Sequence, residues 1–338
     1  QNGAKGATLT QMQAALRASG LTTEQQNAGW QALLASWAED AKADGISFNA
    51  ANAYFGQVGA PVNPAFLSTL GQYYDAGVWQ VDFADQLKAA ADTINAWADQ
   101  QTNGKIKKLF DARDLDPQTL AVLANAVYFK AAWADPFVTD NSAPADFHTP
   151  SGITRPTFMN STGTTATGVI TPDYQAAQLP YTGDRFAATI IMPTTESLSS
   201  FVSALTPADL AKITSALDPA TTGASQAVLS LPRFTTTSDL TLNQALIDLG
   251  MPDAFGPAAD FTAMSPLASH ISLVKQMVYL SVTEQGTEAA AVTGIAVAGM
   301  GAMAPPLVIT VDHPFLFLIR DTQTGAILFA AEITDPQD

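Results

Sequence analysis

Three histidines, His148, His270 and His313, are the side chains best suited to general acid–base catalysis near neutral pH. None lies in a motif with catalytic spacing, because the chain has no Gly-x-Ser-x-Gly, no His-Glu-x-x-His and no phosphate-binding loop. His313 precedes Pro314 at the start of an apolar run, which is typical of a turn or strand residue. We therefore expect structural roles for all three imidazoles and no enzyme activity.

The segment that begins at Glu284 has the pattern of a conformational switch. From Ala289 to Val311 it carries no charged side chain and consists mostly of Ala, Gly, Val and Met. As a strand, one of its faces would present Thr287, Ala289, Ala291 and further small or aliphatic residues. That face has no charge and no ring, so it could be buried in the middle of a sheet. The pattern predicts a loop that can become a strand.

Two other interpretations fit the same uncharged stretch. Residues 289–311 are long enough to span a bilayer as a helix, and their Gly and Ala content is typical of a flexible linker. Pro305 and Pro306 interrupt any helix, and strand-like sequence follows at once. These prolines disfavour a membrane segment, whereas composition alone leaves the linker open.

The elements around this segment mix helices and strands without a regular alternation, which indicates an α+β fold. Apolar spacing predicts helices over Gln11–Ser19, Glu24–Asp40, Phe83–Ala98, Thr206–Leu217 and Leu240–Leu249. Runs of β-branched, aliphatic and aromatic residues predict strands over Leu123–Phe129, Ala187–Met192, Ala227–Leu231, Ile271–Val282, Leu307–Val311, Phe315–Ile319 and Ala326–Ile333.

Two of the expected helices carry apolar stripes that predict their buried faces. The stripe of the helix over 24–40 consists of Trp30, Leu33, Leu34 and Trp37. The stripe of the helix over 83–98 consists of Phe83, Leu87, Ile94 and Trp97.

Composition limits the class of protein further. The chain has 338 residues, 47% of them hydrophobic, and no stretch that would separate two cores, so we expect one domain over 1–338. Its formal net charge of -16 disfavours a nucleic-acid partner, because binding phosphates requires clustered Lys and Arg. The absence of cysteine excludes disulfides and thiolate metal ligands. We expect no metal, no cofactor and no membrane partner.

The segment after Glu284 resembles the reactive-centre loop of the serpins, a family of serine protease inhibitors. The hinge pattern of inhibitory serpins is matched by Glu284, Gly286, Thr287, Glu288, Ala289, Ala290 and Ala291, and the family signature by the sequence around His313-Pro314-Phe315. Further motifs match in order: Asn95-Ala96-Trp97, Leu123 to Trp133, Leu179-Pro180-Tyr181, Leu231-Pro232-Arg233-Phe234 and Leu249-Gly250-Met251. The chain is therefore identified as a member of this family, of inhibitory and prokaryotic type.

The resemblance implies the serpin fold, with three β-sheets, about eight helices and an exposed reactive-centre loop over about 284–306. The first matched motif, Gly3 to Thr8, corresponds to a point past the first two helices of the family, so the family's N-terminal helices are expected to be absent. Some serpins bind glycosaminoglycans through a basic early helix. The corresponding helix, Glu24–Asp40, has no Lys or Arg, so we expect no glycosaminoglycan cofactor.

The resemblance also implies suicide inhibition. A target serine protease cleaves the loop and forms a covalent acyl-enzyme, and the freed hinge inserts into the main sheet as a new strand, so the native fold is metastable. Small uncharged residues at the hinge favour insertion. The alternative is a non-inhibitory serpin that acts as a carrier, chaperone or storage protein.

Counting along the loop as in the family places the reactive bond at Met300-Gly301, with Met303-Ala304 as the alternative. The loop contains no Lys or Arg, which favours a chymotrypsin-like, elastase-like or subtilisin-like protease over a trypsin-like one. We expect a monomer that is extracellular or secreted.

Three sheet positions carry over from the family. Asn125 matches the polar shutter residue, Trp133 matches the aromatic of the breach at the top of the sheet, and Gln276 replaces the shutter histidine. Glutamine can donate and accept, so a hydrogen bond between Asn125 and Gln276 is expected, without the pH sensitivity of a histidine.

Overall fold

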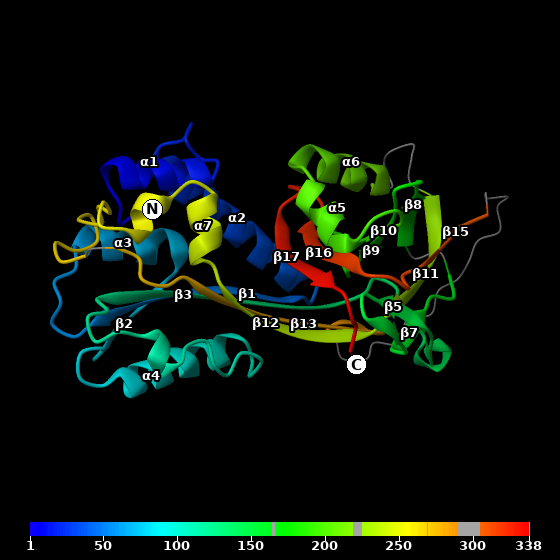
Figure 1. Ribbon diagram of the computed structural model, residues 1–338, viewed down its shortest axis with the longest axis horizontal. Coiled ribbons are helices and arrows are strands. Elements are labelled where there is room, and N and C mark those ends of the chain that lie inside the picture. Colours follow the sequence, from blue (N-terminus) through cyan, green and yellow to red (C-terminus); the bar gives the residue numbers. More distant parts are fainter. Residues whose placement is uncertain (164–165, 219–224, 269, 289–304, 338) are drawn as a thin grey trace. The chain divides into compact units, whose positions relative to one another are not determined.

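The computed structural model describes residues 1–163, 166–218, 225–268, 270–288 and 305–337. The α-helices in this part of the chain are α1 (Gly6–Ala15), α2 (Thr23–Ala43), α3 (Pro64–Tyr74), α4 (Leu87–Gln101), α5 (Leu198–Ala204), α6 (Pro207–Leu217) and α7 (Asn243–Asp248). Short 3-10 helices cover Ala112–Asp114, Thr139–Asn141 and Pro252–Phe255. With the three sheets described next, these elements form the expected α+β serpin architecture (Figure 1).

The site described below belongs to a six-stranded sheet. Its strands lie in the order β12 (Phe234–Thr241), β13 (Lys275–Thr283), β14 (Gly286–Thr287), β3 (Ala121–Ala132), β1 (Ser47–Gln57) and β2 (Gly77–Val81). Strands β1 and β2 run parallel, with Ala53 opposite Gly77.

A nine-stranded sheet and a hairpin account for the other described strands. The main path of the larger sheet is β17 (Ile327–Ile333), β16 (Phe315–Asp321), β10 (Phe186–Pro193), β9 (Tyr174–Pro180), β8 (Ala166–Ile170), β11 (Ser225–Pro232), β7 (Thr157–Asn160) and β4 (Ala143–Pro144). Strand β15 (Leu307–Thr310) pairs with β11, and β5 (Phe147–Thr149) pairs with β6 (Gly152–Thr154). Every residue of β10 and β16 is buried, which explains why both are mostly apolar; the exceptions are Thr189 in β10 and the charged end of β16, Arg320 and Asp321.

The chain folds into two compact units that are both discontinuous in sequence. The first consists of Gln1–Glu39, Phe48–Tyr128 and Thr237–Tyr279. The second consists of Asp40–Ser47, Phe129–Thr236 and Leu280–Asp338. The single domain expected over 1–338 stays a prediction.

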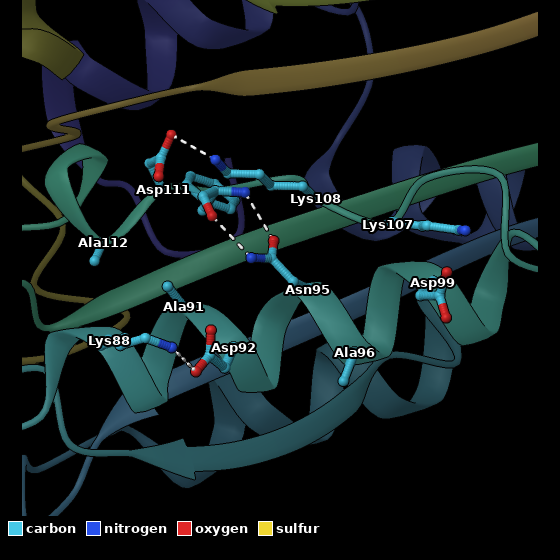
Figure 2. A pocket seen from close by; sticks show the side chains of 11 residues that line it. Lys88, Ala91, Asp92, Asn95, Ala96, Asp99, Lys107, Lys108, Asp111 and Ala112 are labelled. Carbon is cyan, nitrogen blue, oxygen red and sulfur yellow. Dashed lines mark hydrogen bonds and ion pairs between the residues drawn. The ribbon is translucent and has the colours of Figure 1, made fainter.

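In the first unit, α4 is fixed to the segment that follows it by the side chain of Asn95 (Figure 2). Its Oδ1 accepts hydrogen bonds from the backbone N–H groups of Leu109 and Phe110, at 2.7 and 2.9 Å. Its Nδ2 donates to the carbonyl oxygen of Phe110 at 2.8 Å. This one amide satisfies three backbone groups that belong to no regular element.

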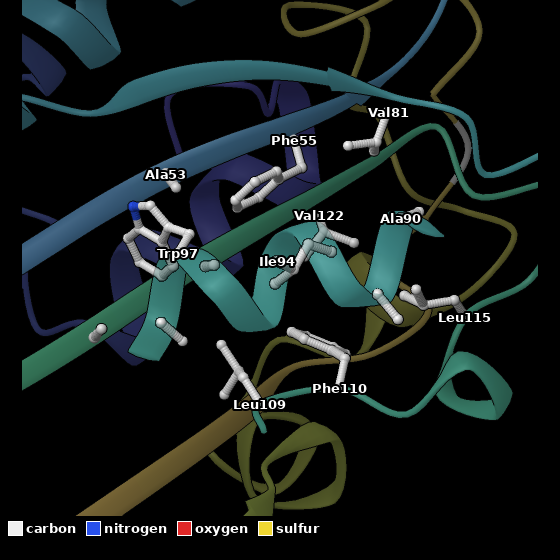
Figure 3. Packing of buried hydrophobic residues seen from close by; sticks show 14 of the residues in the cluster. Ala53, Phe55, Val81, Ala90, Ile94, Trp97, Leu109, Phe110, Leu115 and Val122 are labelled. Carbon is white, nitrogen blue, oxygen red and sulfur yellow. The ribbon is translucent and has the colours of Figure 1, made fainter. Parts of the chain in front are cut away.

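The opposite side of α4 packs on strands β1, β2 and β3 (Figure 3). Ile94 and Trp97 are buried there with Phe55 of β1 and Val122 of β3. The apolar stripe predicted for this helix is confirmed, and Phe83, which precedes the helix, is buried as well.

The stripe of α2 was predicted less well. Trp37 is buried and packs edge-to-face on Phe48, with ring centroids 5.7 Å apart. Trp30 is 46% exposed, so its expected place in the core was wrong. Seven residues separate the two rings, which puts them on the same side of a helix but about 10 Å apart along its axis. Trp30 is therefore exposed because of its position along the helix axis, although it lies on the same side of α2 as the buried Trp37.

The ends of several helices differ from the predicted ones for local reasons. The first helix ends at Ala15 and not at Ser19, because Arg17 has the left-handed φ of 56°. Helix α4 begins at Leu87 and not at Phe83, because a carboxylate oxygen of Asp82 accepts the N–H of Asp85 and forms a turn there. Thr206, the first residue of the helix predicted over Thr206–Leu217, is the N-cap of α6.

Candidate functional site: the docked hinge

The hinge of the predicted reactive loop forms a short strand, β14, between β13 and β3 in the second unit. Both pairings are antiparallel. The register joins Thr287 to Val282 and Ala131, and Gly286 to Thr283 and Ala132. Two hinge residues are therefore already part of the sheet.

Gly286 is required by the closeness of β3. Its φ is 143°, a conformation that side chains with a Cβ rarely adopt. A Cβ at this position would collide with the carbonyl oxygen of Ala131 and lie 2.7 Å from Cα of Ala132. Because both obstacles are backbone atoms, no rotamer change relieves the collision.

Thr287 is bound to a buried tyrosine. Its Oγ1 lies 2.6 Å from Oη of Tyr181, and both residues are almost fully buried. Burial raises the pKa of Tyr181 above its usual range, although the hydrogen bond with Thr287 acts in the opposite direction. The phenol therefore stays protonated and can take part in this bond at any physiological pH.

Trp133, the predicted breach residue, follows the end of β3 and contacts the hinge turn. Its ring stacks on Tyr181 with centroids 4.6 Å apart and an interplanar angle of 13°. Its Nε1 donates to the carbonyl oxygen of Thr283 at 2.9 Å, and its backbone N–H donates to that of Gln285 at 3.1 Å. Trp133 thus binds both the hinge turn and the tyrosine that holds Thr287.

Glu284 opens the hinge turn and is 5% exposed. Its Oε1 forms an ion pair with Nη1 of Arg233 at 3.5 Å. Its carbonyl oxygen accepts the N–H of Phe137 at 2.9 Å. The arginine stabilises this arrangement, because burying a carboxylate without a cation costs free energy.

Glu288 ends the docked strand. Its φ of 54° is left-handed, which is uncommon for a residue with a Cβ, and its N–H donates to the carbonyl oxygen of Ser281 at 3.2 Å. The remaining predicted loop residues lie outside the described part of the chain: Ala289, Ala290, Ala291, Met300, Gly301 and Met303. Their roles stay predictions.

The predicted shutter residues lie in the first unit and are not hydrogen-bonded to each other. Nδ2 of Asn125 donates to Oδ1 of Asn52 at 3.0 Å and to the carbonyl oxygen of Ala51 at 3.3 Å. Gln276 is exposed on β13. Within the described part of the chain, Asn125 bonds to β1 and not to Gln276, so the expected bond was wrong. Nδ2 of Asn125 is instead used by two acceptors of the neighbouring strand β1.

Two of the three histidines lie together away from any catalytic arrangement. The rings of His148 and His313 stack with centroids 4.6 Å apart, and Nδ1 of His313 lies 2.8 Å from Oδ1 of Asp312. Residues 1–163, 166–218, 225–268, 270–288 and 305–337 contain no group of three or more His, Asp or Glu able to hold a metal. None of the helices described is long and apolar enough to cross a membrane.

Sequence reasoning used Tyr181 and Arg233 only as parts of matching motifs and missed their contacts with the hinge. Each carried a signal. Tyr181 is a hydroxyl-bearing ring in a buried apolar run, and a buried tyrosine hydroxyl usually needs a partner. Arg233 is a cation that directly follows the buried end of β11, Leu231-Pro232, where an acidic partner would compensate its charge.

Comparison with known proteins agrees with this geometry. The family described as "Serpin (serine protease inhibitor)" matches residues 1–336. The chain therefore belongs to the serpin family, whose members are classed as protease inhibitors and not as enzymes. Among solved structures, the native state of the thermophilic serpin tengpin is similar, with a TM-score of 0.85 and 25% identity, over 99% of this chain and 84% of tengpin. Serpin48 from the insect Tenebrio molitor has a TM-score of 0.83 and 27% identity, over 99% and 87%.

Two curated relatives have similar sequences. An uncharacterized serpin-like protein from Thermococcus kodakarensis is 32% identical over 290 residues, which cover 85% of this chain and 66% of that protein. Human neuroserpin is 34% identical over 301 residues, which cover 85% of this chain and 71% of neuroserpin. The chain thus spans about two thirds of the length of these relatives.

Proposed function

We propose that this protein inhibits a serine protease of the chymotrypsin-like, elastase-like or subtilisin-like class by suicide inhibition. The protease would cleave the loop at Met300-Gly301 and remain bound as an acyl-enzyme while the hinge side of the loop extends β14. The observation that carries the proposal is the register of β14, in which Gly286 and Thr287 pair with strands on both sides. An inserted loop would continue this pairing in the same direction.

The sequence that follows β14 suits such an extension. Fourteen residues from Thr287 to Met300 would form a strand of roughly 46 Å, at about 3.3 Å per residue. The side chains on the face of Thr287 are small or aliphatic, so they can be buried without an unpaired charge. Each added residue forms backbone hydrogen bonds with both neighbours and buries apolar surface. These many small terms supply the free energy of insertion.

The deciding experiment is incubation with chymotrypsin, elastase and subtilisin, followed by denaturing electrophoresis and mass spectrometry. We expect a covalent adduct that resists denaturation, with the new carboxyl end at Met300. Cleavage by every protease without an adduct, and without a gain in thermal stability of the cleaved protein, would instead support a carrier, chaperone or storage function.

Two threonine variants separate insertion from simple binding of the protease. Thr287→Arg places a charge at a buried position of β14, so the loop should still be cleaved but the adduct should be lost. Thr310→Arg is the matched control, because Thr310 is an exposed strand residue and should leave the adduct intact. We also propose that the protein acts outside the cell and as a monomer.

A further inference from the structure

A groove of about 650 Å³ lies between α4 and residues 107–112 in the first unit (Figure 2). The three hydrogen bonds of Asn95 hold its two walls at a fixed separation. Its volume lies in the range typical of small-molecule sites, roughly 300–1,000 Å³. Its floor includes Ala91 and Phe110, which also belong to the core cluster around α4, whereas its other lining residues are mostly polar or charged.

Most of the charge in this groove is neutralised internally. Nζ of Lys88 lies 2.6 Å from Oδ2 of Asp92, and Nζ of Lys108 lies 2.9 Å from Oδ2 of Asp111. These two pairs leave little attraction for a simple anion or a polyanion at this surface.

The other two charged lining residues, Lys107 and Asp99, have no ion-pair partner among the residues that the structure describes. Lys107 lies on the loop wall and Asp99 on the helix wall, toward the C-terminal end of α4 (Figure 2). The groove therefore offers one cation and one carboxylate, on opposite walls.

The carboxylate of Asp99 is in an electrostatically unfavourable position. Its Oδ1 is shielded from solvent and has no hydrogen-bond partner. Asp99 also lies in the last turn of α4, where the helix dipole disfavours negative charge, and no basic residue occupies that turn. Because this carboxylate lies at the negative end of a helix and one of its oxygens is unpaired, it favours a cation at its other oxygen, Oδ2.

We propose that this groove binds a small zwitterion of the amino-acid type, with its ammonium group on Asp99 and its carboxylate on Lys107. Both charged residues then gain a partner, and the groove remains neutral overall. A monovalent amine would leave Lys107 unpaired, and a monovalent acid would leave Asp99 unpaired. The site therefore selects for a molecule that carries both groups.

Calorimetric titration with glycine, γ-aminobutyrate and ε-aminohexanoate tests this site, because these probes share both end groups and differ in the distance between them. Hexylamine and hexanoate are the controls with a single charge. We expect at least one zwitterion to bind at least about tenfold more tightly than either control. Equal or weaker binding of all three zwitterions would overturn the proposal.

Variants locate the site. Asp99→Asn and Lys107→Met should each weaken binding of the preferred zwitterion about tenfold or more. The double variant Lys88→Met/Asp92→Asn is the matched control, because it removes an exposed pair of the same groove without changing its net charge, and it should leave binding within about twofold. If this double variant weakened binding as much as Lys107→Met, the assigned contacts would be wrong. None of these readouts depends on protease inhibition.

Discussion

The hydroxyl oxygens of Tyr181 and Thr287 lie 2.6 Å apart, in a place where neither residue is more than 1% exposed. Water cannot replace either partner, so each hydroxyl depends on the other. This contact links Thr287 of the hinge to the ring of Tyr181, which stacks on Trp133. It therefore couples the position of the loop to the packing at the end of β3.

Tyr181→Phe should loosen the hinge while it preserves the aromatic stack. The change removes only the hydroxyl and leaves Oγ1 of Thr287 buried without a partner, which costs roughly 1–3 kcal/mol. Hydrogen exchange of the peptide that spans Gly286 and Thr287 should become faster, and the free energy of unfolding should fall.

A double-mutant cycle with Thr287→Val tests the same bond. If the two hydroxyls form one interaction, the double variant should be more stable than the sum of the single effects predicts. Additive effects would show that the hydroxyls act independently.

Gly286→Ala should expel β14 from the sheet. The new methyl group meets backbone atoms of Ala131 and Ala132, which cannot move without disturbing β3. We expect fast hydrogen exchange at the hinge. Gly59→Ala is the control, because Gly59 also has a positive φ, 76°, but has open space around it. Equal exchange at the hinge in both variants would contradict the steric argument.

Arg233→Gln should destabilise the hinge turn. It leaves the carboxylate of Glu284, whose side chain is 6% exposed, without its cation. Because the arginine side chain is itself 34% exposed, the loss should be roughly 1–3 kcal/mol and below that of a fully buried pair. Lys212→Gln breaks the exposed pair with Asp209 and should change stability by less than about 1 kcal/mol, as urea unfolding can measure.

The pair of Lys275 and Asp114 predicts a pH dependence. Burial tends to raise the pKa of Asp114, but the hydrogen bonds from Lys275 and from the N–H of Asp111 lower it overall. Burial tends to lower the pKa of Lys275, but its bonds to Asp114 and Asp239 raise it overall. The lysine Nζ lies 2.9 and 3.2 Å from the two carboxylates.

The sign follows from these directions. A lowered carboxyl pKa stabilises the fold above the unfolded pKa of about 3.9, and this contribution is lost as the pH falls through the folded value. A raised lysine pKa stabilises below the unfolded value, and this contribution is lost as the pH rises through the folded value. Urea unfolding should therefore show Lys275→Met less stable than the wild type near neutral pH, with a smaller difference at both extremes. A constant difference would contradict the assignment.

If Met300-Gly301 is the reactive bond of the proposed inhibitor, Met300→Arg should direct it to trypsin. An arginine before the reactive bond can pair with the acidic specificity pocket of a trypsin-like protease, whereas methionine cannot. We expect a trypsin adduct with this variant and none with the wild type. Met303→Arg distinguishes the two candidate bonds, because only the true position should yield the adduct.

The fold was predicted well where the sequence is strongly patterned. Strands β10 and β16 and the stripe of α4 come from continuous or periodic apolar runs. Strand β1 was missed, because its central Asn-Ala-Ala-Asn-Ala has neither β-branched residues nor alternation. Strand β1 is held in the sheet by its pairing with neighbouring strands, and the local sequence pattern carries no information about that pairing.

The candidate site was predicted from the hinge residues but not from their partners. Gly286 and Thr287 could be recognised from the local sequence, because small residues in this order match the hinge pattern. Tyr181 lies more than a hundred positions away in sequence, and only tertiary folding brings its hydroxyl to Thr287. The wrong partner for Asn125 has the same origin, since the choice between β1 and β13 depends on side-chain reach across the sheet.

The two paired residues of β14 bear on how fast a strand could grow there. Starting a strand between two others normally requires closing a loop before any bond is gained, and this entropy forms a nucleation barrier. With Gly286 and Thr287 already in register, that step is complete in the uncleaved chain. Growth would then require Glu288 to leave its left-handed conformation, after which it could proceed by propagation, one residue after another. Its rate would be set by how readily β13 and β3 separate ahead of the growing end.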